Sequence, residues 1–150
     1  YPRGEAYSGL RDYRAPIEYG KGEWIYREKD ILLLAVGSMV HTAEDVWGAL
    51  KDKGYACSLV NARFVKPIDE TLIREALSEH SLIVTLEENV ASGGFGEKVR
   101  SYVDSLETTC EVMTVAIPDE YVEHGNVEAL KREIQIDAQS ITERIIDVLL

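Results

Sequence analysis

The run ILLLAV, at Ile31–Val36, indicates the architecture of this chain. A continuous apolar run of this kind is typical of a strand in a parallel sheet whose two faces are both covered by helices. Gly37 ends the run, and apolar residues then recur on one helical face as far as Gly54. The sequence therefore predicts a buried strand that leads directly into an amphipathic helix.

The same change from an apolar strand to an amphipathic helix recurs along the chain. Cys57–Val60 and Leu82–Leu86 are expected to be strands, and helical patterns follow both of them. Val112–Ile117 is expected to be the last strand, before a short helix near Val127–Ile134 and a final helix from about Ser140. This alternation predicts an α/β protein with three layers, α/β/α, in which helices cover both faces of a doubly wound sheet.

The first strand is expected to differ from the others. Gly20–Arg27 contains Trp24 between glycines and charges, which favours a short edge strand, and the charged turn Glu28–Asp30 then leads to Ile31. So short a connection implies that the two strands pair antiparallel. We therefore expect a five-stranded, mostly parallel sheet with an antiparallel first strand at its edge.

The chain is expected to form one domain with an arm in front of it. Residues 1–19 show neither a strand period nor a helix period, so we interpret them as a linker or docking arm from a preceding domain. Residues 20–150 form the expected domain, which is large enough to bury a core of its own. The opening segment Tyr1–Gly4 also suggests a piece of a longer protein.

Composition argues against several classes of partner. The chain has 27 acidic and 16 basic residues, and this formal charge of −11 at pH 7 opposes binding to a nucleic-acid backbone. No apolar run approaches the ~18 to 20 residues that a membrane span requires, so no membrane partner is expected. Cys57 and Cys110 lie in predicted strands without metal-binding or redox spacing, which is typical of buried thiols in a reducing cytoplasm.

Two polar runs follow predicted strands, where α/β domains carry their functional loops. They are NARFVKPID, at Asn61–Asp69, and EENVASGGFG, at Glu87–Gly96. Gly93 and Gly94 open a predicted helix whose exposed amides could receive a phosphate, but the acidic residues just before them would repel an anion. Tight packing of helix against strand is therefore the favoured interpretation of these glycines, and a phosphate site is the alternative.

The neighbouring carboxylates of Glu87 and Glu88 could in principle divide acid–base work between them. Adjacent side chains of an extended chain point in opposite directions, however, so we expect one of the two to form a structural ion pair with Arg63 or Lys66. Asp69 is expected to cap the helix that follows it.

The remaining candidate is His124, which lies in a loop after the last predicted strand. It is the one histidine for which we consider a function, and packing of the loop is its favoured role. The residues alone contain neither a complete catalytic set nor a metal-ligand spacing. They indicate a binding or scaffolding domain without catalytic, cofactor-binding or metal-binding residues of its own.

The two polar runs and the segments Gly37–His41, Ile117–Asp119 and Glu123–Gly125 together resemble the C-terminal, transketolase-like domain of 1-deoxy-D-xylulose-5-phosphate synthase. The resemblance covers essentially the whole chain. It implies a transferase that condenses pyruvate with D-glyceraldehyde 3-phosphate to 1-deoxy-D-xylulose 5-phosphate and CO2. It also implies thiamine diphosphate held through Mg²⁺ in the full-length enzyme, and a place in isoprenoid and thiamine biosynthesis in the cytoplasm.

The same resemblance implies that the chemistry lies outside this chain. In that family the metal motif belongs to the N-terminal domain, and the glutamate that activates the coenzyme belongs to the middle domain. We therefore expect the isolated chain to bind no cofactor and to be inactive. Its implied partners are those two domains, within a homodimer that it supports, and Arg3 is a candidate at the edge of the site for the substrate phosphate.

Two alternatives stay open. Transketolases and the β subunits of 2-oxo acid dehydrogenases carry a similar domain, and the latter resemble the chain at Arg63–Asp69 in particular. The chain could also be a free-standing, flavodoxin-like domain that binds a regulatory ligand where the strand order reverses, near Gly37, Ser38 and Glu87.

Overall fold

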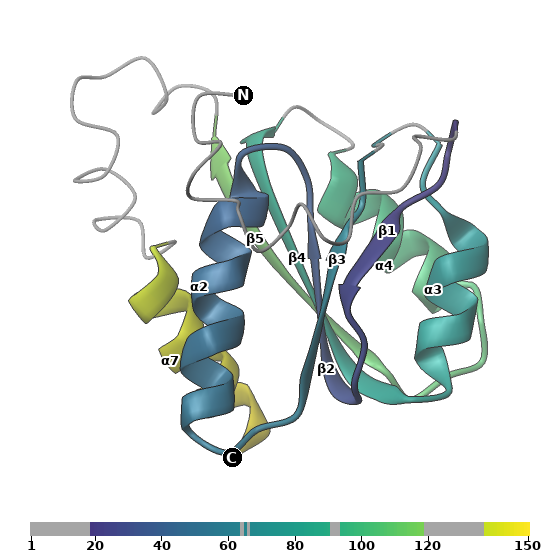
Figure 1. The fold of residues 1–150 in the computed structure, drawn as a ribbon. Coiled ribbons are helices and arrows are strands. Elements are labelled where there is room, and N and C mark those ends of the chain that lie inside the picture. The colour runs from purple at the N-terminus through teal and green to yellow at the C-terminus, as the bar shows by residue number, and fades with distance from the viewer. Residues whose placement is uncertain (1–18, 64, 66, 91–93, 119–136) are drawn as a thin grey trace.

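A sheet of five strands with helices on both faces forms the described part of the molecule (Figure 1). The computed structural model describes residues 19–63, 65, 67–90, 94–118 and 137–150. The strands are β1 (Glu23–Tyr26), β2 (Asp30–Ala35), β3 (Cys57–Asn61), β4 (His80–Val90) and β5 (Glu111–Pro118). The helices are α2 (Met39–Asp52), α3 (Glu70–Leu77), α4 (Phe95–Asp104) and α7 (Ala138–Leu149).

The sheet topology confirms the predicted fold class. The strand order is β1-β3-β2-β4-β5, in which β3, β2, β4 and β5 run parallel and β1 runs antiparallel at the edge. Helices α2 and α7 cover one face of this sheet, and α3 and α4 cover the other (Figure 1). The arm expected before residue 19 and the helix expected near residues 127–134 lie outside the described residues.

The partner of β1 was predicted wrongly. β1 pairs antiparallel with β3, whereas the short link from β1 to β2 had indicated a hairpin between those two strands. The link instead passes the start of β3, where the amide of Glu28 donates a hydrogen bond of 2.6 Å to Oγ of Ser58. β2 already has β3 and β4 as parallel neighbours, so β1 cannot pair with β2 and lies at the edge, beyond β3.

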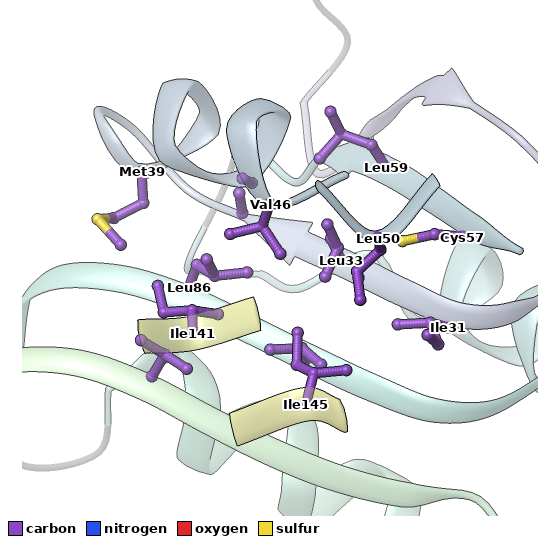
Figure 2. Close-up of a cluster of buried hydrophobic side chains, with 14 of the residues drawn as sticks. Ile31, Leu33, Met39, Val46, Leu50, Cys57, Leu59, Leu86, Ile141 and Ile145 are labelled. Carbon is purple, nitrogen blue, oxygen red and sulfur yellow. The ribbon is translucent and has the colours of Figure 1, made fainter. Parts of the chain in front are cut away.

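The apolar run of β2 supplies side chains to both faces of the sheet, because successive side chains of a strand point to opposite sides. Leu33 is buried against α2 and α7, in the cluster that Figure 2 shows, while Leu32 and Leu34 are buried against α3 and α4. Ile141 and Ile145 bring α7 into the first cluster. The sheet therefore has two apolar cores, one on each side.

The predicted helical stripes agree with the observed burial. In α2, Ala43, Val46 and Leu50 are fully buried. Trp47 is partly exposed; its indole N–H donates a hydrogen bond of 2.8 Å to the carbonyl oxygen of Cys57, and its ring stacks on Tyr26 with centroids 3.9 Å apart. These contacts attach the edge strand β1 to the helix that follows β2.

The cap predicted for α3 is present. Oδ1 of Asp69 accepts a hydrogen bond of 3.1 Å from the amide of Leu72, as a helix-capping carboxylate does. Oδ2 of the same carboxylate accepts one of 2.9 Å from the amide of Gly22, just before β1. A single side chain thus starts α3 and fixes the approach to β1.

The two cysteines differ in burial and in position, although both were predicted to be buried within strands. Cys57 begins β3 and is buried, whereas Cys110 is half-buried and lies just before β5 rather than within it. Burial raises the pKa of the Cys57 thiol to about 12, with the carboxylate of Glu28 adding to the effect. Burial also raises the pKa of Cys110 to about 11. Both thiols are free.

Candidate functional site at the carboxyl end of the sheet

The strand order reverses between β2 and β4. The chain passes from β2 through α2 to β3 on one side, and from β3 through α3 to β4 on the other side of β2. The amide of Val36 donates a hydrogen bond of 3.0 Å to the carbonyl oxygen of Leu86, which places Gly37 beside Glu87. Doubly wound sheets bind their ligands at such a reversal, so this edge is the candidate site.

Glu87 belongs to strand β4, which extends beyond the predicted end at Leu86. Glu87 and Glu88 continue the ladder opposite Ala116 and Ile117 of β5, so the expected acidic turn is a strand end. Neighbouring side chains of a strand point to opposite faces, and the two glutamates therefore do not form a carboxylate pair.

The carboxylate of Glu87 caps helix α4. Its Oε1 accepts a hydrogen bond of 2.8 Å from the amide of Phe95, and its Oε2 accepts one of 2.5 Å from the amide of Gly96. The residue is only 6% exposed, and Gly94 at the N-cap position has no side chain to do this work. Glu87 thus binds the helix amides, and an ion pair between one of the two glutamates and Arg63 or Lys66 stays a prediction.

Close packing of α4 on the sheet requires glycine at position 96. A Cβ added to Gly96 would lie 2.8 Å from both Cγ2 of Thr114 and Oγ1 of Thr85, closer than a real Cβ comes to such atoms. Gly94 has an extended backbone at φ −63°, and Gly93 lies outside the described residues. At Gly96, the glycine run serves the tight contact of helix and sheet.

Arg63 forms its ion pair with the edge strand. Its Nη2 lies 2.6 Å from Oε1 of Glu23, and the two side chains are only 11% and 10% exposed. Arg63 adopts a left-handed backbone at φ 63°, and its amide donates a hydrogen bond of 3.1 Å to Oδ1 of Asn61. The pair joins the end of β3 to the start of β1, a contact between residues distant in sequence.

A shallow apolar pocket lies between β1, β3 and the start of α3. Its wall includes Gly22, Ala62, Leu72 and Phe95, and Asp69 stands at its side with both oxygens engaged as described. The pocket therefore offers apolar contact but no polar group aimed at a ligand.

The chain matches a known domain family over most of its length. The sequence model of the transketolase C-terminal domain matches residues 20–141. This chain belongs to the transketolase C-terminal domain family. The resemblance in the two polar runs is thereby confirmed.

Relatives of this transketolase C-terminal domain are 1-deoxy-D-xylulose-5-phosphate synthases. The one from Lachnoclostridium phytofermentans is 43% identical over 146 residues, which is 97% of this chain and 23% of the relative. The one from Dictyoglomus thermophilum is 37% identical over 99% of this chain and 24% of its own length. The chain thus spans about a quarter of the length of the synthases it matches.

A solved structure agrees with the fold. A split-gene transketolase, described as an inactive β4 tetramer, superposes with a TM-score of 0.78 at 25% identity. The match covers 89% of this chain and 43% of the other. The three-layer fold predicted for a transketolase C-terminal domain is therefore confirmed.

Only some of the predicted site residues lie at the described edge of this transketolase C-terminal domain. Glu87 and Gly94 meet at the start of α4, while Arg63 lies at the edge with Glu23. Arg3, Lys66, Gly93 and His124 lie outside the described residues.

Sequence reasoning missed Thr85 and a buried network at the opposite end of the sheet. His80 begins β4: its Nδ1 donates to the carbonyl oxygen of Ala76 at 2.8 Å, and its Nε2 lies 2.8 Å from Oγ of Ser58. With the ring proton on Nδ1, Nε2 of a neutral imidazole is an acceptor, so the hydroxyl of Ser58 donates to it while accepting from the amide of Glu28. Ser58 and His80 lie 22 positions apart in the sequence, so no local pattern indicated this contact.

The described residues offer no donor set for a metal. Within the ranges that the structure describes, no group of three or more His, Cys, Asp or Glu side chains could hold a metal ion. In the same ranges, no helix is both long and apolar enough to cross a membrane. At this edge, the acids Glu87, Asp69 and Glu23 each bind a backbone amide or a guanidinium.

Proposed function

We propose that this chain is the C-terminal domain of a 1-deoxy-D-xylulose-5-phosphate synthase. The observation that carries the proposal is the similarity to such synthases over nearly the whole chain, at a quarter of their length. In the full enzyme, pyruvate and D-glyceraldehyde 3-phosphate condense on thiamine diphosphate with Mg²⁺, in the cytoplasm. This step supplies isoprenoid and thiamine biosynthesis.

In this proposal the domain is structural. The carboxylates at the candidate site hold elements of the domain together: Glu87 holds α4, Asp69 holds α3, and Glu23 holds the end of β3. A carboxylate whose oxygens already accept short hydrogen bonds from backbone amides is poorly placed to move protons for a substrate. The domain then contributes rigid surfaces to the N-terminal and middle domains and to a homodimer.

The described residues do not fit a diphosphate-bound metal. The one glycine-rich helix start on this edge is filled by the carboxylate of Glu87, and no metal-ligand cluster is present among the described residues. We therefore assign the coenzyme to the N-terminal and middle domains of the full enzyme and no step of the reaction to this chain. This assignment makes the isolated chain inactive.

A domain replacement tests the proposal. The C-terminal quarter of the Lachnoclostridium phytofermentans synthase is exchanged for this chain, and formation of 1-deoxy-D-xylulose 5-phosphate is measured with thiamine diphosphate and Mg²⁺. We expect the chimera to be active, while the same synthase without its C-terminal quarter and this chain alone are not. A soluble, dimeric chimera without activity contradicts the proposal.

Calorimetry addresses the free-standing alternative. Thiamine diphosphate with Mg²⁺ is titrated into the 150-residue chain, and we expect no heat of binding. Micromolar binding would mean that the chain holds a coenzyme site of its own.

A further inference from the structure

We propose that the start of α4 is an anion-binding cradle that the chain fills with the carboxylate of Glu87, and that a small free carboxylate occupies the same place once Glu87 is shortened. This inference concerns the edge where a phosphate had been one interpretation of the glycine run. It does not rest on the proposed synthase function.

The first part of the cradle is the amino end of the helix. The amides of Phe95 and Gly96 have no carbonyl partner within the helix, because the first amides of any helix lack one. They donate instead to the two oxygens of Glu87, at 2.8 and 2.5 Å. The helix dipole adds a partial positive charge at this end, so the position favours a negatively charged group.

The second part is the hydroxyl of Thr85, which is independent of the helix. Thr85 is fully buried, and its Oγ1 has no hydrogen-bond partner among the described residues. This oxygen lies 2.8 Å from the point where a Cβ on Gly96 would lie, and Oε2 of Glu87 lies 3.1 Å from the same point. A buried donor without a partner therefore lies beside the start of α4, close to the carboxylate of Glu87 but without a hydrogen bond to it.

The absence of a side chain at Gly96 brings these groups together. Thr85 and Glu87 project from the same face of β4 toward α4, since alternate residues of a strand share a face. A side chain at position 96 would collide with Thr85 and approach Glu87. The cradle therefore consists of two amides that bind the carboxylate of Glu87 and a nearby hydroxyl that a free anion could also engage, with Gly96 between them.

The chemistry favours a small monovalent carboxylate over a phosphate. Glu87 is 6% exposed, so little water reaches the site to screen a second charge. Glu97 lies in the first turn of α4, and the chain carries a formal charge of −11. A divalent phosphate would be repelled there through two negative charges, whereas formate carries one. Formate also has the same planar carboxylate group as the lost side chain.

The native chain is consequently closed to phosphate at this edge. Its own carboxylate is held at a fixed distance along β4, so it competes as an intramolecular ligand at high effective concentration. Inorganic phosphate added to the native chain should therefore give no more stabilisation than sodium chloride of the same ionic strength.

Chemical rescue tests the cradle. Glu87→Ala is expected to lower the melting temperature of the chain, and sodium formate, but not sodium chloride of equal ionic strength, should restore part of the loss. Formate at about five times its dissociation constant should raise the melting temperature by about 2 to 4 °C in a chain of this size. Glu88→Ala, at the neighbouring position, and the wild type should respond equally to both salts.

Two further variants separate the cradle from a general salt effect. Glu87→Gln keeps a side chain in the cradle, so formate should not stabilise this variant beyond chloride. Thr85→Val as a single substitution should give a chain as stable as the wild type, because it removes a hydroxyl that has no partner. In the Glu87→Ala background the same change should weaken formate binding about tenfold, because an anion loses a hydrogen bond.

Equal responses of Glu87→Ala to formate and chloride would overturn the proposal. So would specific stabilisation of the wild type by inorganic phosphate. If Glu87→Ala does not fold in chloride, recovery of its circular dichroism in formate becomes the measurement, and failure to recover there overturns the proposal as well.

Discussion

The two faces of the sheet differ in what lies between sheet and helix. On the face covered by α2 and α7, the strands present apolar side chains such as Leu33 and Leu86 (Figure 2). On the face covered by α3 and α4, buried polar side chains lie among the apolar ones, and they include Ser58, Thr85 and Glu87. The strand side chains of the first face pack mainly by apolar contact, with a hydrogen bond from Trp47 of α2 to a strand carbonyl, while those of the second face also make hydrogen bonds of their own.

This contrast separates what a sequence pattern reveals from what it conceals. An apolar face needs only residues of the right kind at the right period, and a reader of the sequence sees that period directly. A polar contact needs two particular atoms to meet, and the partners of Glu87 and Ser58 are fixed only by the completed fold. The predictions that follow probe this contrast, beginning with the largest effect.

Leu33→Ala should cause the largest loss. Leu33 is fully buried in the middle of the sheet, and removing a side chain at such a site leaves a cavity as well as losing apolar burial. We expect the free energy of unfolding, measured by urea denaturation, to fall by about 3 to 5 kcal/mol. Leu149→Ala, at a position 38% exposed, should cost less than about 0.5 kcal/mol. Similar losses at both positions would contradict the assignment of the core.

Arg63→Ala should cause the next largest loss of stability. The change leaves the Glu23 carboxylate, whose side chain is 10% exposed, without its guanidinium, and we expect a loss of about 1 to 3 kcal/mol in the same measurement. The exposed pair of Arg27 and Glu79 gives the control, because Glu79→Ala should cost less than about 0.5 kcal/mol. An unchanged midpoint for Arg63→Ala would remove this ion pair from the account of the edge.

Ser58→Ala tests the hydrogen-bond chain below α3. Its hydroxyl binds the partly buried amide of Glu28 and the buried Nε2 of His80, so its removal should leave both without this partner and cost about 1 to 2 kcal/mol. Ser81→Ala, at an exposed position near the same end, should be close to neutral. If both serines proved neutral, the hydrogen bonds of Ser58 would add nothing to the stability of this face.

Cys57 provides the smallest effect, on the α2 and α7 face. Its pKa is raised to about 12 in the folded chain, so the thiol stabilises the fold fully below the pKa of the unfolded thiol. This contribution is lost as pH rises toward the folded value. Between about pH 9 and 10.5, the stability of the wild type relative to Cys57→Ala should fall by on the order of 1 kcal/mol. A constant difference would mean that the thiol is not shielded from water.

The sequence predicted the fold well where apolar periodicity governs it. The buried strand after Asp30, the stripe of α2 and the Asp69 cap all rest on local patterns, and all are present. The partner of β1 could not be read in this way, because a short link allows either a hairpin or a passage beyond β3. The difference depends on which strand occupies the flank of β2, and that is a property of the whole sheet.

The candidate site was predicted less well for a related reason. The location of Glu87 at the strand-order reversal followed from the order of strands and helices. Its binding to the amides of Phe95 and Gly96 did not, because β4 runs on past its apolar part and the helix start folds back onto it. Arg63 pairs with Glu23, 40 positions back along the chain, and no local pattern in the sequence indicated that partner.

The irregular pairing of β1 has a consequence for how the domain meets other proteins. The register of β1 on β3 shifts between Trp24 and Tyr26, so this edge strand is short and twisted rather than flat. An incoming strand from another molecule needs a straight row of free amides and carbonyls to extend a sheet. The β1 edge is therefore a poor template for backbone hydrogen bonds to another strand, and a partner that meets this border would dock through side chains.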